Sequence, residues 1–223
     1  MDDNLTDQQR AEQIRVWLGE NGWYLLAGLV LGLAALFGWR QWTGYNATHA
    51  EEASALYEEM LSAVRIGRTT RAEEIAAQLA KDYASTPYLD QARLAMAKMK
   101  LDASRPEDAV KYLEQVVKES DSAEVARIAR LRLARVLSQE GKYDDALKVL
   151  TDPGDSAFGP RFHEVRGDVY YGMGRLDEAR AEYEAALRGD PSAVGDVAFL
   201  QAKLAEISGG AAPAPATAAP GGN

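Results

Sequence analysis

The pattern of apolar and polar positions divides the chain into three parts. From Gly22 to Trp39 no side chain is charged, and this apolar run is bounded by Glu20 and Arg40. At about 1.5 Å per residue such a helix reaches roughly 27 Å, close to the thickness of the hydrocarbon core of a bilayer. From residue 50 to residue 207 apolar positions instead recur every three or four residues, which predicts a series of amphipathic helices. The last sixteen residues, 208–223, are nearly all Ala, Pro and Gly and are expected to be disordered.

The apolar run predicts a transmembrane helix over residues 21–42. A bilayer interface favours amphipathic aromatic and basic side chains at both ends of such a helix, and five are found there: Trp23, Tyr24, Trp39, Arg40 and Trp42. A cleaved signal peptide would have a basic leader, but residues 1–20 hold five acids and two arginines. A buried helix of a soluble protein is the other alternative, although it would need apolar neighbours on every side.

The basic residues beside the apolar run predict its orientation. Arg10 and Arg15 precede the run, and Arg40 alone follows it closely. Because positive charge is retained on the cytoplasmic side, this bias favours a cytoplasmic segment over residues 1–20. The expected location is the inner (cytoplasmic) membrane, crossed once, with residues 43–207 on the periplasmic side.

The helical part repeats itself. The clearest unit fits the tetratricopeptide pattern, in which small residues allow two helices to approach, aromatic residues fill the space between them, and proline ends the second helix. Its residues are Gly167, Tyr170, Gly174, Ala179, Tyr183, Ala186 and Pro191. One period earlier, Ala134, Gly141, Tyr143, Ala146 and Leu150 take the corresponding places.

Two further units are less regular. Ala97, Pro106, Ala109 and Leu113 repeat the pattern 37 residues earlier, and the extra residues predict a lengthened turn over 119–122. Residues 50–86 form either a degenerate repeat or a capping helix pair, and a terminal helix is expected to cover the last repeat. The fold class is therefore all-α: one N-terminal transmembrane helix followed by a right-handed α-solenoid of tetratricopeptide-like helix pairs.

A stack of helix pairs presents a concave face that suits protein segments. Counting from the repeat motif, the expected groove positions are Leu94, Lys98, Leu131, Arg135, Glu164, Asp168 and Tyr171. The helix containing Leu131 also carries Arg127, Arg130, Arg132 and Arg135, of which only one pair can face the groove. These arginines belong either to a solvated face or to a partner contact. The groove residues carry charges of both signs and include no asparagine. A clamp of lysine and asparagine residues that grips the terminal carboxylate of a partner is therefore not expected.

Composition excludes several classes of function. The chain has no cysteine and two histidines, without a histidine pair at metal-ligand spacing or a phosphate-binding loop, so neither an enzyme nor a cofactor is expected. Its net charge is −9, of which −7 belongs to residues 43–223, with 29 acids and 22 bases. An acidic domain is a poor match for phosphate backbones, so nucleic-acid binding is not expected.

The combination resembles the bacterial YfgM-like family of ancillary subunits of the Sec translocon. The residues that carry the resemblance are Glu20-Asn21-Gly22, Gly38-Trp39-Arg40-Gln41-Trp42, Leu131-Arg132-Leu133-Ala134-Arg135-Val136, Asp145-Ala146-Leu147-Lys148 and Val165-Arg166-Gly167-Asp168. The tail after Ser208 departs from the family's shorter ending.

The resemblance implies a set of partners. They are the SecYEG channel, the periplasmic chaperone PpiD, emerging or unfolded polypeptides that pass on to periplasmic chaperones, and the lipid bilayer that holds the anchor. It also implies restraint of the Rcs stress response. From the residues alone, a scaffold for another envelope assembly and a cytoplasm-facing signalling adaptor stay open as alternatives.

Overall fold

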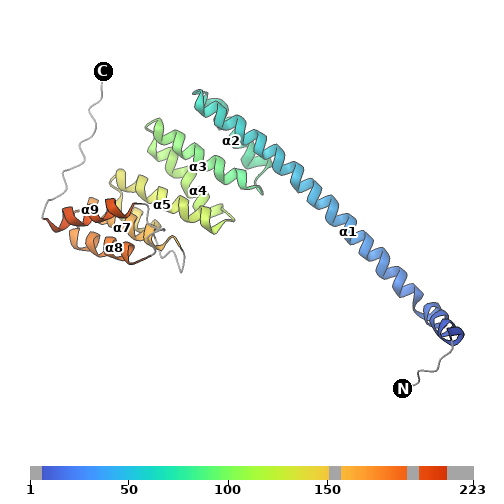
Figure 1. Ribbon diagram of the computed structural model, residues 1–223. Coiled ribbons are helices and arrows are strands. Elements are labelled where there is room, and N and C mark those ends of the chain that lie inside the picture. Colours follow the sequence, from blue (N-terminus) through green and yellow to red (C-terminus); the bar gives the residue numbers. More distant parts are fainter. Residues whose placement is uncertain (1–6, 151–156, 190–195, 210–223) are drawn as a thin grey trace. The chain divides into compact units, whose positions relative to one another are not determined.

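The structure is a computed structural model that describes residues 7–150, 157–189 and 196–209, and every regular element in these ranges is an α-helix (Figure 1). The helices are α1 (Asp7–Arg65), α2 (Thr69–Asp82), α3 (Pro87–Asp102), α4 (Pro106–Glu119), α5 (Ala123–Gln139), α6 (Tyr143–Val149), α7 (Gly159–Gly172), α8 (Leu176–Arg188) and α9 (Val197–Ser208). The chain divides into two compact units, Met1–Ser54 and Ala55–Asn223, which are described separately.

The first unit consists of most of α1. Its apolar stretch has a mean hydropathy of 1.7, and none of that window is buried by other residues of the chain. The side chains of Trp23 and Tyr24 are each 73% exposed, and those of Trp39 and Trp42 are 65% and 57% exposed. By length and composition this helix is a candidate membrane span, since a bilayer would cover the apolar surface that the protein leaves open.

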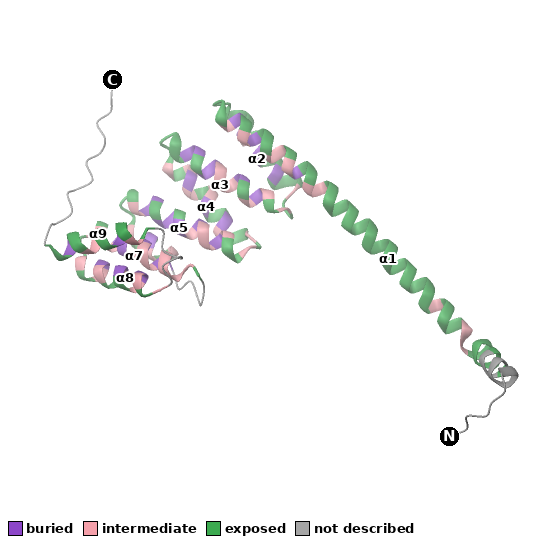
Figure 2. Cartoon of the chain, viewed as in Figure 1, coloured by how far each residue is buried: buried purple, intermediate pink, exposed green. Residues whose placement is uncertain are grey.

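The second unit stacks helices in pairs. The C-terminal end of α1 pairs with α2, and the following pairs are α3–α4, α5–α6 and α7–α8. Each of these helices buries the residues of one face and exposes those of the opposite face (Figure 2). In α4 the stripe is Ala109, Leu113 and Val116, at the three- and four-residue spacing of one helical face. The stripes of α3 to α7 pack into one core and those of α8 and α9 into a second cluster, so each pair depends on its neighbours for burial.

The turn inside each pair has the same geometry four times. Gly67, Ser104, Gly141 and Gly174 have φ values of 74°, 55°, 73° and 75°. In every case this residue donates its N–H to the carbonyl three residues back, and the next residue donates to the carbonyl five residues back, at 2.8–3.1 Å. This is the Schellman motif, which satisfies the last carbonyls of a helix. The first pair shares this turn geometry, as a degenerate repeat over residues 50–86 would.

The connection between the second and third pairs is shorter than the sequence predicted. α4 ends at Glu119 and α5 begins at Ala123, so the turn spans only three residues and the extra length lies in the helices: α4 has 14 residues, whereas α6 has 7. The expected lengthened turn was wrong because the Ser122 hydroxyl caps α5, accepting a hydrogen bond from the Val125 N–H at 3.3 Å.

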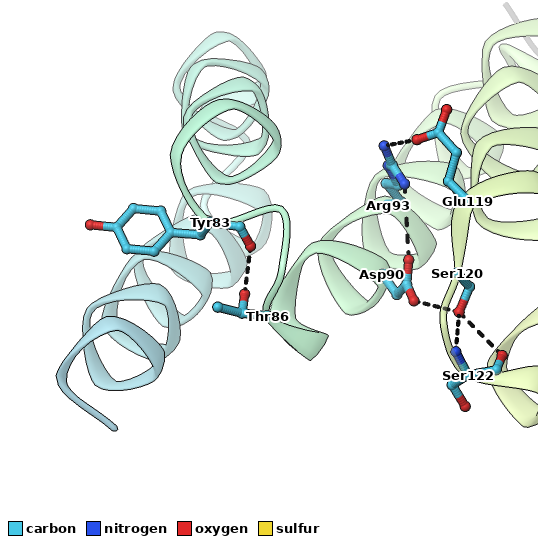
Figure 3. Close-up of polar contacts among 7 residues, drawn as sticks. All are labelled: Tyr83, Thr86, Asp90, Arg93, Glu119, Ser120 and Ser122. Carbon is cyan, nitrogen blue, oxygen red and sulfur yellow. Dashed lines mark hydrogen bonds and ion pairs between the residues drawn. The ribbon is translucent and has the colours of Figure 1, made fainter. Parts of the chain in front are cut away.

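Polar contacts hold this short connection against the start of α3 (Figure 3). The Ser120 hydroxyl donates to Asp90 at 2.6 Å, and the Ser122 N–H donates to the Ser120 hydroxyl at 3.2 Å. Arg93, whose side chain is 11% exposed, forms an ion pair with Glu119 at 2.5 Å. The junction between these two pairs is therefore fixed by side chains as well as by the apolar core.

The repeat positions divide into packing residues and turn residues. Ala134, Ala146, Ala179 and Ala186 are fully buried, and Tyr183 is 1% exposed. Gly167 lies against the ring of Tyr183, where an added Cβ would meet Cδ1 and Cε1 at 2.4 Å. Gly141 and Gly174 differ, because they are exposed and an added Cβ would meet nothing within 4 Å. The predicted helix-ending residue Pro191 lies outside the described residues.

The terminal helix α9 closes the described part of the array. Its N-cap Asp196 accepts a hydrogen bond from the Phe199 N–H at 3.0 Å, and Leu200 and Ile207 are buried in a cluster with Ala179, Tyr183 and Ala186. Leu200 is 1% exposed and Ile207 is 3% exposed. α9 therefore covers apolar surface that α8 would otherwise expose.

Candidate functional site

A groove of about 300 Å³ opens between α3 and α5. It is lined by Leu94, Ala97, Lys98 and Leu101 of α3, Leu113 of α4, and Arg132, Arg135, Val136 and Gln139 of α5. On both α3 and α5 the lining residues follow each other at intervals of three, one and three residues, so each helix contributes one continuous face. The groove is thus built by two successive first helices of the repeat.

The floor of the groove is apolar. Ala97, Leu113 and Val136 are 2%, 1% and 4% exposed, because they also belong to the core between the helix pairs. Leu101 is 36% exposed, and Leu94 is half-buried. The open part of the groove therefore presents leucine side chains whose burial by a partner would be favourable.

The rim of the groove is basic. Lys98, Arg132 and Arg135 are exposed on it, together with Gln139. Lys98 forms an ion pair with Asp102 at 2.6 Å, and both side chains are largely in water. Arg132 and Arg135 form no ion pair or side-chain hydrogen bond with any residue of the described ranges. The rim therefore carries two uncompensated positive charges on a chain whose net charge is −9.

The remaining two arginines of α5 lie elsewhere. Arg127 and Arg130 are half-buried and do not line the groove, and Arg127 approaches Glu124 at 3.9 Å. The helical spacing indicated that only one of the two pairs could face the groove. The structure places Arg132 and Arg135 there.

The structure brings three of the seven expected groove residues together, Leu94, Lys98 and Arg135. Leu131 is 7% exposed and belongs to the core between the helix pairs. The other three lie on α7 with partners inside the chain. Glu164 pairs with Arg161 at 3.0 Å, Asp168 with Lys203 at 2.5 Å, and Tyr171 donates to Glu206 at 2.8 Å.

Asp168 and Tyr171 therefore help to dock α9, whereas the partner of Glu164 lies on α7 itself. Asp168 also accepts a hydrogen bond from the Tyr183 hydroxyl at 2.8 Å. Burial and the neighbouring Asp168 carboxylate raise the pKa of Tyr183 well above its usual range, so the phenol remains a donor. The carboxylates of Glu164 and Asp168 are paired within the protein, whereas Arg132 and Arg135 of α5 have no such partner among the described residues.

Residue counting missed the buried floor of the groove, Ala97, Leu113 and Val136, and also two of its more exposed residues. Leu101 and Gln139 lie seven residues after Leu94 and Arg132, two helical turns along the same faces. A heptad step from Leu94 and a four-residue step from Arg135 would have found both. Leu113 comes from the second helix of a pair, and its place under the groove follows only from the packing of α4 between α3 and α5.

The titratable groups of the second unit form structural pairs. His163 Nδ1 lies 2.7 Å from Glu182, which also accepts from Arg166 at 3.2 Å. Lys100, 5% exposed, is paired with Glu73 of α2. Within the described ranges no group of three or more His, Asp or Glu side chains has the geometry of a metal site. The chemistry that the groove offers is recognition by apolar contact and positive charge.

Helix pairs with identical turns and a lined groove define a class of protein, the tetratricopeptide-like interaction domain. Residues 15–209 match the family described as "Tetratricopeptide repeat-like domain". A crystal structure of Podosopora anserina kinesin light chain TPR-like repeats has a similar fold, with a TM-score of 0.54 at 18% identity, covering 72% of this chain and 87% of that one.

Curated relatives narrow the family further. The "Ancillary SecYEG translocon subunit" of Escherichia coli strain K12 is 30% identical over 84% of this chain and 89% of its own length. The protein of the same description from Neisseria gonorrhoeae is 30% identical over 90% of this chain and 97% of its own. The Haemophilus influenzae protein of the same description is 27% identical over 82% of this chain and 89% of its own length. The chain belongs to this tetratricopeptide repeat-like family of ancillary translocon subunits, and the resemblance found in its sequence is confirmed.

Proposed function

We propose that the chain is a membrane-anchored, non-catalytic scaffold that associates with the Sec translocon and binds partner proteins through its helical repeats. The observation that carries this proposal is the nearly full-length similarity to proteins named ancillary SecYEG translocon subunits. The candidate membrane span of α1 and the open groove between α3 and α5 supply what such a role requires, an anchor and a binding surface.

The membrane arrangement is part of the proposal. We place the span in the inner membrane, with the amino end in the cytoplasm and the repeats in the periplasm, because Arg10 and Arg15 outnumber Arg40 beside the apolar run. A phosphatase that is active only outside the cytoplasm, fused after Asn223, is expected to be active. A stable but inactive fusion would reverse the orientation.

In this arrangement the scaffold meets polypeptides as they leave the channel. We propose that it works beside the membrane-anchored chaperone PpiD and passes emerging polypeptides to periplasmic chaperones. Confinement to the membrane raises the effective concentration of the groove near its partners, so a modest intrinsic affinity suffices. Removal of residues 1–42 is therefore expected to abolish function at native abundance while the repeats remain folded.

Site-specific crosslinking in membranes tests the role directly. A photoreactive residue in place of Arg135 is expected to give adducts with SecYEG subunits or with PpiD. The same residue in place of Lys118, an exposed position of α4 outside the groove, is the matched control. Adducts from Arg135 that contain neither translocon components nor periplasmic chaperones would contradict the proposal.

A further inference from the structure

The two unpaired arginines of the groove carry information about what it binds. Elsewhere on α3 and α7, charged residues that point outward are matched by the chain itself, as Lys98 is by Asp102 and Asp168 by Lys203. Arg132 and Arg135, like the exposed Lys81 and Lys118 outside the groove, have no such partner among the described residues, on a chain with nine more acids than bases. Because acids are abundant and yet absent from this rim, the charge is open to a partner.

The apolar floor beside these arginines limits the kind of partner. The volume of about 300 Å³ is at the lower end of the range of pockets that enclose a small molecule, roughly 300–1,000 Å³, and this groove is open along one side. It can hold a few side chains of one face of a longer element. Leu94 and Leu101 lie two turns apart on α3, so apolar side chains of a partner helix at positions i, i+3 or i+4, and i+7 would match them.

The chain already contains one example of this mode of docking. α9 places Leu200 and Ile207, seven residues apart, against α8 and keeps its polar contacts at the edge, where Lys203 meets Asp168 and Glu206 meets Tyr171. An apolar stripe with charged residues beside it is thus accepted by the repeats. On α5 the corresponding edge is positive instead of negative.

We propose that the groove between α3 and α5 binds an amphipathic helix of a partner protein, with Glu or Asp residues beside its apolar stripe that pair with Arg132 and Arg135. The inference deepens the proposed scaffold role and rests on it for the assumption that the occupant is another protein. The acidic residues select the partner by charge, and the leucines of the floor supply most of the contact area.

Peptide binding to the full chain in detergent or nanodiscs tests the proposal. The probe is a fluorescein-labelled, helix-forming peptide of about 14 residues, with Leu at i, i+3, i+7 and i+10 and Glu at the positions beside them. One comparison peptide has Lys in place of every Glu, and another has the same composition with the Leu positions scrambled. Fluorescence anisotropy at several salt concentrations gives the dissociation constants.

The wild-type chain is expected to bind the Glu peptide at least tenfold more tightly than the Lys peptide or the scrambled peptide. The variant with Arg132→Glu and Arg135→Glu is expected to bind the Glu peptide at least tenfold more weakly than the wild type does, which corresponds to about 1.4 kcal/mol. It is expected to bind the Lys peptide more tightly than the wild type does. Lys81→Glu with Lys118→Glu is the matched control, since both lysines are exposed and outside the groove. It is expected to change binding less than twofold.

Loss of apolar contact is tested separately with Leu101→Gln, which changes a side chain that is already 36% exposed and leaves the core intact. Weaker binding of the Glu peptide is expected. Equal binding of the Glu and scrambled peptides, an unchanged affinity in the arginine variant, or an equal loss in the lysine control would each overturn the proposal.

Co-purification of the same variants with SecYEG from membranes separates this inference from the proposed function. If the wild-type chain retains SecYEG but shows no preference for the Glu peptide, the groove inference fails and the scaffold role stands. If the peptide preference holds while neither SecYEG nor PpiD accompanies the wild-type chain, the translocon role fails and the groove chemistry stands.

Discussion

The close contact between α7 and α8 at Gly167 gives the sharpest stability prediction. A Cβ at this position would lie 2.4 Å from two ring carbons of Tyr183, whereas carbon atoms in contact ordinarily stay about 3.5–4.0 Å apart. The ring cannot move aside freely, because it is 1% exposed and its hydroxyl donates to Asp168 at 2.8 Å. Gly167→Ala must therefore displace the ring or the helix backbone.

The magnitude follows from two opposing terms. Overpacking in a close-packed core costs about 1–3 kcal/mol, and a contact this short belongs at the upper end of that range. Replacing a helical glycine by alanine gains about 1 kcal/mol of helix propensity. We therefore expect Gly167→Ala to lower the free energy of unfolding by about 2 kcal/mol. Gly159→Ala is expected to change it by less than about 0.5 kcal/mol, because an added Cβ meets nothing within 4 Å there and the propensity gain of a helix interior does not apply at the first residue of α7.

Urea denaturation of the full chain in detergent, followed by far-UV circular dichroism, measures the effect. With a urea dependence of about 2 kcal/mol per molar, the midpoint for Gly167→Ala is expected to fall by about 1 M. Combining Gly167→Ala with Tyr183→Leu is expected to cost about 3 kcal/mol less than the sum of the single changes, since the smaller side chain removes the clash and leaves the gain in helix propensity. A Gly167→Ala variant as stable as the wild type, or more stable, would refute the packing argument.

Three further predictions concern single positions of the second unit. Ser104→Gly is expected to raise the free energy of unfolding by about 0.5–1 kcal/mol in the same urea assay, because φ is 55° and a side chain is strained there; a loss of stability would contradict the turn assignment. Lys100→Met is expected to be tolerated within about 1 kcal/mol, whereas Glu73→Gln, which leaves a lysine that is 5% exposed without its carboxylate, should cost about 2 kcal/mol. Equal effects of these two changes would show that the ion pair does not govern the site. The hydrogen bond from Arg175 lowers the pKa of Glu178 below its ordinary value of 4.5, so its stabilising contribution is present above that pH and is lost as the pH falls through the lowered pKa. Midpoints measured against pH should therefore show wild type and Arg175→Gln converging in acid, and a constant difference would exclude this linkage.

The helical class and the repeat could be predicted because they depend on short-range pattern. Gly141 and Gly174 marked two turns, and the apolar stripes marked the helices that follow them. The turn at Ser104 was missed because serine rarely adopts a positive φ, although it lies 37 residues before Gly141, as Gly67 lies 37 residues before it. The backbone hydrogen bonds of the Schellman motif, donated by Ser104 and Arg105, offset the strain of this conformation.

The groove was predicted less completely than the fold. Periodicity identified Leu94, Lys98 and Arg135, since these positions depend only on helix geometry. It could not reveal that Asp168 and Tyr171 are engaged by α9, because the distance along the chain between α7 and α9 hides their contact. A groove position is available to a partner only if the rest of the chain leaves it open, and sequence periodicity carries no information on that.

The uncompensated guanidinium groups of Arg132 and Arg135 also have a consequence for kinetics. Charges at an open rim attract an oppositely charged segment before any atom touches, over about a Debye length, which is roughly 8 Å at physiological salt. Salt should therefore slow the encounter with an acidic helix, while the residence time, set by leucine contacts shielded from solvent, changes little. When charge sets the encounter rate and apolar contact sets the residence time, a scaffold of the proposed kind captures passing segments quickly and still releases them. That property is useful where polypeptides arrive one after another.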